Sequence, residues 1–294
     1  MPKEVISLPA TVTSTANKKV KYVRSLYRRR VRHKERHFVI EGLRLVEEAL
    51  KAGVVPALAF FTPDLSDSQR GGELLAVIED LPGECFIVTD KVMRALSDTV
   101  SPQGILAVVP FLELPLPEDS WLFLVVDRVR DPGNLGTILR SAEAAGVSQM
   151  ILTPATVDVY SPKVVRGAMG AHFYLPIVTG VSWSKMAEAL GDRQILLAEA
   201  KGDKVYYEVD WTKPSALIVG SEAEGVSQEA EKLATERIAI PMQGKAESLN
   251  VAVAASVILF EAARQRVIQQ DGKDAGFSAH RGPQRPVGRR PGRL

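Results

Sequence analysis

The chain has 294 residues, with 37 Lys and Arg against 35 Asp and Glu, so its net charge is only +2. This length suits two domains of ordinary size. Cys85 is the single cysteine, which excludes an internal disulfide framework and fits a reducing compartment. No run of about 18 apolar residues occurs, so no membrane span is predicted. The first residues lack the apolar core of a signal peptide, and we expect a cytoplasmic protein.

The small net charge hides a strong segregation of charge along the chain. Residues 17–37 contain ten Lys and Arg and one acid, Glu35, which gives a net charge of +9. Residues 271–294 contain six Lys and Arg against two acids, and the rest of the chain is acidic. Such asymmetry predicts that the basic segment binds a polyanion. The alternative is a solvated basic face without a partner.

The N-terminal part has the pattern of a small α/β domain. Residues 1–16 show no periodicity and are predicted to be a flexible leader. From residue 17, apolar side chains recur every three or four positions, which predicts a helical face surrounded by cations. Then follow strands at 38–41, 57–61, 85–89 and 105–111, with helices at 43–52, 73–79 and 91–96. The pattern predicts a domain over 17–112, followed by a proline-rich linker at 113–120.

A second alternating series covers residues 121–270. Its predicted strands are 122–126, 150–153, 176–178, 195–198, 216–220 and 238–241. Its predicted helices are 135–145, 162–169, 184–190, 227–234 and 249–270. Apolar strands without alternation, each followed by a helix, are typical of a parallel sheet that is covered on both faces. Residues 271–294 are rich in Gly, Pro and Arg, and we expect a disordered basic tail.

The last predicted helix is apolar on nearly every face, which is typical of a buried helix. Ser248 and Asn250 stand at its N-terminus, where backbone N–H groups have no partner within the helix. We therefore expect this N-terminus to face an interior cleft that holds a polar ligand.

Two further loops stand at predicted strand ends, where α/β sheets bind ligands. In the loop after residue 126, Pro132 and Gly133 indicate a turn, and Asn134 is a candidate helix N-cap. Arg140 follows among small and apolar residues, and is either paired structurally or directed at a phosphate. In residues 220–225, glycines flank two carboxylates; this indicates either a tight turn or a loop around a cationic ligand.

Several common motifs are absent from the sequence. No Gly-x-Gly-x-x-Gly follows a strand, and no Walker-type Gly-Lys-Ser/Thr occurs, so neither standard dinucleotide nor phosphate loop is predicted. His33 and His37 share a helical face but have no carboxylate or thiol partner in sequence. We therefore predict no metal site.

The order of the three loops resembles a known family. Asn134 and Arg140, then Gly-Ser-Glu-Ala-Glu-Gly225, then Ile-Pro-Met242 with Ser-Leu-Asn250, resemble the three motifs of the SpoU (TrmH-type) RNA 2′-O-ribose methyltransferases. Ala223 stands where that family more often has glycine. The basic N-terminal unit is similar to the substrate-binding domain of the ribosomal-RNA branch.

The resemblance implies a fold, a cofactor and a set of site residues. It implies a C-terminal trefoil-knotted parallel-sheet domain, S-adenosyl-L-methionine as methyl donor, and a homodimer. By motif position, Gly220, Ile240, Met242 and Leu249 would bind the cofactor. The implied catalytic set is Asn134, Arg140, Glu222, Ser248 and Asn250. The expected RNA contacts are Lys18, Lys19, Lys21, Arg24, Arg28, Arg29, Arg30 and Arg32.

The resemblance favours methylation of a ribose 2′-hydroxyl in large-subunit ribosomal RNA. A transfer-RNA 2′-O-methyltransferase is one alternative. A non-catalytic RNA-binding or ribosome-assembly protein of the same fold is another. A metabolic nucleotide enzyme would leave the +9 segment unexplained.

Overall fold

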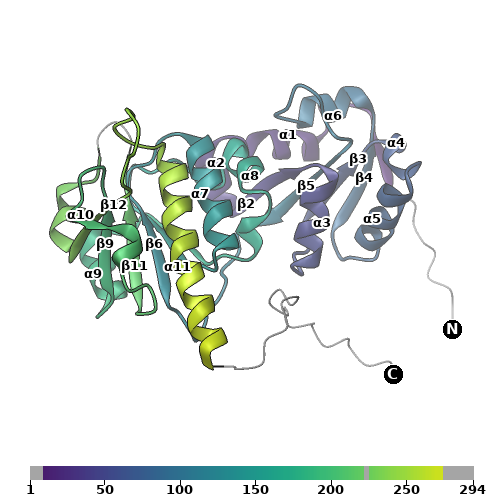
Figure 1. Ribbon diagram of the computed structural model, residues 1–294. Helices are drawn as coiled ribbons and strands as arrows, with labels where there is room; N and C mark the ends of the chain where they lie inside the picture. Colours follow the sequence, from purple (N-terminus) through teal and green to yellow (C-terminus); the bar gives the residue numbers. More distant parts are fainter. Residues whose placement is uncertain (1–8, 222–224, 274–294) are drawn as a thin grey trace.

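The computed structural model describes residues 9–221 and 225–273, which form two α/β units (Figure 1). None of the described helices is long and apolar enough to cross a membrane. The predicted basic tail lies largely outside the described residues, as does Glu222 of the predicted catalytic set.

The N-terminal unit is built on a five-stranded sheet of order β1-β4-β3-β5-β2. Strands β1, β4 and β3 are parallel neighbours, and β5 is antiparallel to both β3 and β2. The strands are Ala10–Val12 (β1), His37–Glu41 (β2), Leu58–Phe61 (β3), Glu84–Val88 (β4) and Ile105–Pro110 (β5). The helices are Lys18–Ser25 (α1), Arg29–Glu35 (α2), Leu43–Lys51 (α3), Pro63–Ser66 (α4), Gln69–Glu79 (α5) and Asp90–Leu96 (α6).

Two predictions for this unit are wrong. The flexible leader contains β1, which pairs with β4 and buries Val12; three residues are too few for a periodic pattern. The basic helical segment is two helices, because the chain leaves α1 at Leu26 and Arg28 is extended. This break buries Leu26 with the α1 face, and it lets α2 present Arg32 to the C-terminal unit.

The C-terminal unit is a seven-stranded parallel sheet of order β10-β12-β9-β11-β6-β7-β8, which confirms the predicted parallel sheet of an α/β fold. Its strands are Leu122–Val126 (β6), Gln149–Leu152 (β7), Ile177–Thr179 (β8), Gln194–Ala198 (β9), Lys204–Val205 (β10), Ser215–Val219 (β11) and Glu236–Ala239 (β12). Its α-helices are Pro132–Ala144 (α7), Pro162–Ala168 (α8), Trp183–Leu190 (α9), Gln228–Leu233 (α10) and Val251–Lys273 (α11), and two 3₁₀ turns are Ala171–Phe173 (η1) and Tyr206–Glu208 (η2). The sequence pattern missed β10, which has only two residues.

Helix α11 is only partly buried in the single chain, contrary to the prediction. Val251, Ala255 and Ile258 are buried against the sheet and α7, whereas Val253 and Phe260 are 48% and 51% exposed. An all-apolar helix needs cover on every side, and one chain covers only one side of α11.

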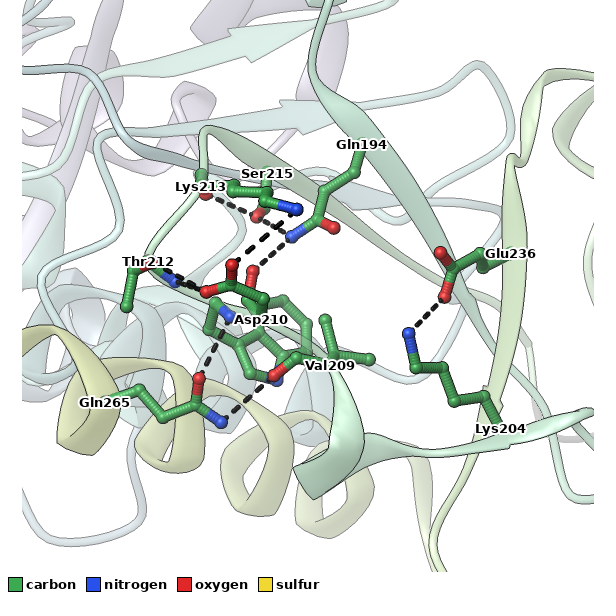
Figure 2. Close-up of polar contacts among 10 residues, drawn as sticks. Gln194, Lys204, Val209, Asp210, Thr212, Lys213, Ser215, Glu236 and Gln265 are labelled. Atoms are coloured by element: carbon green, nitrogen blue, oxygen red, sulfur yellow. Dashed lines mark hydrogen bonds and ion pairs between the residues drawn. The ribbon is translucent and has the colours of Figure 1, made fainter.

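The far end of α11 is fastened to the segment that leads into β11 (Figure 2). Gln265 Nε2 donates to the Val209 carbonyl at 3.1 Å, and Gln265 Oε1 accepts from the Trp211 backbone N–H at 3.0 Å. The Trp211 side chain is fully buried, and its indole N–H donates to the Tyr206 carbonyl. These hydrogen bonds hold the C-terminal part of α11 at the amino end of β11. The N-terminus of α11 therefore lies near the carboxyl ends of the strands.

The two units share one large hydrophobic cluster, and each unit also has a smaller cluster of its own. Phe38 and Ile40 of the first sheet belong to the same buried cluster as Leu122 of the second. The rings of Phe111 and Tyr160 stack across the junction with centroids 3.7 Å apart. The units are therefore packed together as one body.

A buried ion pair also joins the units and corrects one predicted RNA contact. Arg32, only 3% exposed, places Nη2 2.5 Å from Asp158 Oδ2, and Asp158 is 8% exposed. His33 Nε2 lies 3.1 Å from Asp158 Oδ1. Arg32 is thus committed to the C-terminal unit and is not available to a phosphate group.

Candidate active site

A cavity of about 460 Å³ lies where β9, β11 and β12 end at their carboxyl edge. Its apolar part includes Ile238, Ala254 and Ile258. The structure brings four predicted cofactor residues and one predicted catalytic residue to its wall, namely Gly220, Ile240, Met242, Leu249 and Ser248. Such a volume, mainly apolar and with a few polar groups, is typical of a small-molecule site.

Gly220 closes one side of this cavity through a close backbone approach. A Cβ at Gly220 would lie 2.4 Å from Val226 Cγ1 and 2.7 Å from the Gly225 carbonyl oxygen. Ser221 and Gly225 exchange two backbone hydrogen bonds of 2.9 Å, so the described ends of the predicted loop are held together. Any larger residue at 220 would push this loop away from the strand end.

Two asparagines of the predicted catalytic set meet beside the cavity, although neither lines it. Asn250 Nδ2 donates to Asn134 Oδ1 at 3.0 Å, which joins residues 116 positions apart. Asn250 Oδ1 accepts from the Ala252 backbone N–H at 3.0 Å and so caps α11. Asn134 was predicted to be the N-cap of α7, but the N-cap is Asp131. The Asp131 carboxylate accepts a hydrogen bond from the Asn134 backbone N–H.

Arg140 is exposed on α7 and does not line the cavity. Within residues 9–221 and 225–273, no hydrogen bond or ion pair of its guanidinium is found. The next residue, Ser141, accepts a 2.7 Å hydrogen bond from Ser256 of α11. The structural-pairing alternative for Arg140 therefore has no support among the described residues, and its charge faces outward beside α11.

The sequence pattern missed two carboxylates near the site. Asp127, 1% exposed, accepts from Thr153 Oγ1 at 2.8 Å and from the Ser227 backbone N–H at 2.6 Å, and so ties the loop after β6 to the loop after β11. Glu199 lines the cavity and lies 3.2 Å from Arg237. A carboxylate directly after an apolar strand was the only available signal for either residue.

The basic segment presents most of its predicted RNA contacts to solvent. The exposed members are Lys18, Lys21, Arg24, Arg28, Arg29 and Arg30. Lys19 is half-exposed and pairs with Glu84. Val20, Val23 and Leu26 bury the other face of this segment. Among the described residues, no group of three or more His, Cys, Asp or Glu is placed to hold a metal ion.

Comparison with known proteins gives matches over both units. Residues 121–260 match the SpoU rRNA Methylase family, and residues 17–107 match the MRM3-like substrate binding domain. A Bacillus subtilis protein named "23S rRNA (guanosine(2553)-2'-O)-methyltransferase RlmP" is 34% identical over 85% of this chain and 97% of that protein. The mouse "rRNA methyltransferase 3, mitochondrial" is 33% identical over 85% of this chain and 72% of that protein.

Solved structures agree with these matches. An AdoMet-bound rRNA methyltransferase from Sinorhizobium meliloti has a TM-score of 0.77 and 32% identity, covering 88% of this chain and 98% of that one. The AviRb methyltransferase from Streptomyces viridochromogenes, in complex with AdoMet, has a TM-score of 0.77 and 29% identity, covering 85% of this chain and 98% of that one. The chain belongs to the SpoU rRNA methylase family and carries an MRM3-like substrate-binding domain at its N-terminal side.

Proposed function

We propose that this protein transfers a methyl group from S-adenosyl-L-methionine to a ribose 2′-hydroxyl of large-subunit ribosomal RNA. The observation that carries the proposal is the convergence of all three motifs at one edge of the parallel sheet. Relatives named as rRNA methyltransferases align with both the catalytic and the substrate-binding unit, which favours ribosomal over transfer RNA.

The cavity fits the proposed donor. Gly220, Ile240, Met242 and Leu249 would hold it through backbone groups and apolar contacts, and the backbone cradle at Gly220 leaves no room for a Cβ. When bound, S-adenosyl-L-methionine supplies a methyl group on a sulfonium that is an excellent leaving group. The protein must then position the acceptor hydroxyl and assist the loss of its proton.

We assign the remaining motif residues to positioning and charge stabilisation. A guanidinium group presents a planar set of N–H donors, so Arg140 suits bidentate binding of a phosphate and stabilisation of the developing alkoxide. The bonded pair Asn134 and Asn250 would orient the ribose. Ser248 would support the cavity loop, and Glu222 would do the same from outside the described residues.

We also infer a homodimer, a trefoil knot in the C-terminal unit and a cytoplasmic location. Val253 and Phe260 of α11 are exposed apolar residues, and a protein partner would bury them. A second copy of the chain can do so with the same face of its own α11. Along the axis of α11, Arg140 lies at the height of these exposed residues, because its neighbour Ser141 is hydrogen-bonded to Ser256 of α11. Dimerisation would therefore also enclose Arg140.

The first experiment maps 2′-O-methylated nucleotides by mass spectrometry in ribosomal RNA from cells with and without this protein. Loss of one ribose methylation supports the proposal, and unchanged large-subunit ribosomal RNA contradicts it. Calorimetric titration with S-adenosyl-L-methionine separates an enzyme from a purely RNA-binding relative, which need not bind the donor.

The second experiment changes Arg140→Ala. We expect retained binding of donor and RNA, with turnover lowered by about 10²–10³-fold, as for loss of one charge-stabilising group. The matched control is Lys185→Ala, which removes an exposed cation from α9, away from the cavity and from α11. Near-normal methylation by Arg140→Ala would refute the assigned role.

A further inference from the structure

A second cavity, of about 500 Å³, lies in the N-terminal unit, away from the proposed methyl-transfer site. It is placed where the parallel strands β3 and β4 end, an edge at which α/β sheets commonly bind ligands. Residues that line it include Thr62, Asp64, Asp90, Met93 and Arg94. None of these belongs to the basic segment or to the three motifs.

Thr62 gives this cavity a hydroxyl group. Its side chain is on a residue that is only 7% exposed, and no hydrogen bond of its hydroxyl is found in the described part of the chain. The hydroxyl oxygen lies beside Gly104, another lining residue, 3.0 Å from where a Cβ at Gly104 would stand. The hydroxyl is reached by solvent from the cavity, so it is available to donate to or accept from a ligand atom.

One wall of the cavity is formed by the end of the segment that runs from α6 to Gly104. Glu41, at the end of β2, holds the start of this segment in place. Ser97 Oγ donates to Glu41 Oε2 at 2.7 Å, and Thr99 Oγ1 donates to Glu41 Oε1 at 2.9 Å. Met93, 2% exposed, is an apolar residue of the lining. The segment that leads to Gly104 is therefore fixed, and the lining combines apolar Met93 with polar and charged side chains.

The charges of the lining indicate which part of a nucleic acid could enter. Asp64 and Asp90 are two acceptors that would repel a phosphate, whereas they suit the amino and imino donors of a base. Arg94 provides a guanidinium plane on which a base can stack. The cavity thus fits a neutral nucleobase better than the phosphate backbone.

The cavity lies next to the basic segment. Tyr27, two residues after the end of α1, donates to the Leu96 carbonyl at the end of α6, at 2.5 Å, and α6 carries Asp90, Met93 and Arg94. Helices α2, α1 and α6 follow one another along the upper side of the molecule (Figure 1). An RNA strand held by α1 and α2 can therefore reach the cavity.

We propose that this cavity binds one unpaired nucleotide of the RNA substrate, with the donor edge of its base on Asp64, Asp90 and Thr62. The proposal rests on the proposed function for the class of substrate, and it adds base recognition to the phosphate contacts of the basic segment. Sequence-specific recognition of RNA typically uses unpaired bases in this way.

The test compares Asp64→Asn/Asp90→Asn with wild type for binding to an in vitro transcript of large-subunit ribosomal RNA. The two explanations predict opposite signs. If the carboxylates bind a base, affinity falls by about tenfold or more, as expected for lost base contacts. If they only contribute charge, removal of two negative charges raises affinity.

Matched controls make the outcome decisive. Glu79→Gln/Asp80→Asn removes the same charge at the exposed end of α5, which precedes the amino end of β4, and should not lower affinity. Thr62→Val removes only the hydroxyl, and should also weaken binding without changing the salt dependence, since no phosphate contact is lost. Unchanged donor titration and circular dichroism verify that each variant is folded.

Photo-cross-linking of wild-type protein to the same transcript provides an independent readout. Peptides that contain Thr62–Ser68 or Asp90–Arg94 should carry a nucleotide. Unweakened binding by both variants, or no cross-link in these peptides while the basic segment cross-links, would overturn the proposal. The proposed function is tested separately, by methylation of ribosomal RNA by the wild-type protein. Methylation supports the proposed function even if the base-binding proposal fails, and absence of methylation contradicts the proposed function.

Discussion

Replacing Arg32 by Met should destabilise the whole protein, because Arg32 forms a buried ion pair between the two units. Arg32 directs Nε and Nη2 at Asp158 Oδ2, at 3.2 and 2.5 Å, and Nη1 at the Leu26 carbonyl, at 2.5 Å. Met fills a similar volume but leaves the buried Asp158 carboxylate without its main partner. The comparison therefore isolates the charge and its hydrogen bonds from packing.

The expected magnitude follows from burial. Removing one member of a buried ion pair costs about 3–5 kcal/mol of unfolding free energy. His33 remains 3.1 Å from Asp158 Oδ1 and still stabilises the buried carboxylate in part. We therefore expect a loss of unfolding free energy at the lower end of this range, about 3 kcal/mol. Burial acts to raise the pKa of Asp158, but hydrogen bonding and charge from Arg32, aided by His33, hold that pKa below its ordinary value. The contribution of the pair is thus complete above the ordinary carboxyl pKa and is lost as pH falls through the lower folded value.

Urea unfolding followed by tryptophan fluorescence at pH 7 measures the effect. Arg30→Met, on the same helix but exposed, is the control and should change stability by less than about 0.5 kcal/mol. Adding Asp158→Asn to Arg32→Met should recover part of the loss, since no buried charge then remains. If Arg32→Met costs no more unfolding free energy than Arg30→Met, the ion pair does not stabilise the junction.

Three further predictions concern other parts of the molecule. Replacing the three arginines at 28–30 with Ala should weaken RNA binding and flatten its dependence on salt, because phosphate contacts release counterions; an unchanged slope would contradict this. Gly220→Ala should abolish calorimetric binding of S-adenosyl-L-methionine, because the added Cβ would lie 2.4 Å from Val226 Cγ1; normal affinity would show that the loop yields. Burial lowers the pKa of His172 to about 4, so stability should fall by about 3 kcal/mol as pH drops from about 6.5 to about 4, where unfolding takes up a proton. A His172→Gln variant should lose that part of the pH dependence in urea titrations.

The sequence by itself determined the class of fold and the order of the motifs. Apolar strands such as Leu122–Val126 and the helices between them have patterns set by local burial, so a parallel sheet could be predicted before any contact was known. The family resemblance singled out Gly220, Ile240 and Leu249, and they line one cavity in the structure because the carboxyl ends of parallel strands share an edge. Their roles in binding remain predictions.

Only the tertiary structure decided which basic side chains are exposed to RNA and which apolar surfaces are buried. Arg32 is part of the same basic run as Arg30, yet one is buried against Asp158 and the other is exposed. The apolar pattern of α11 likewise could not show that Phe260 stays exposed. Charge and hydropathy are local properties of a sequence, whereas partner and exposure depend on residues more than a hundred positions away.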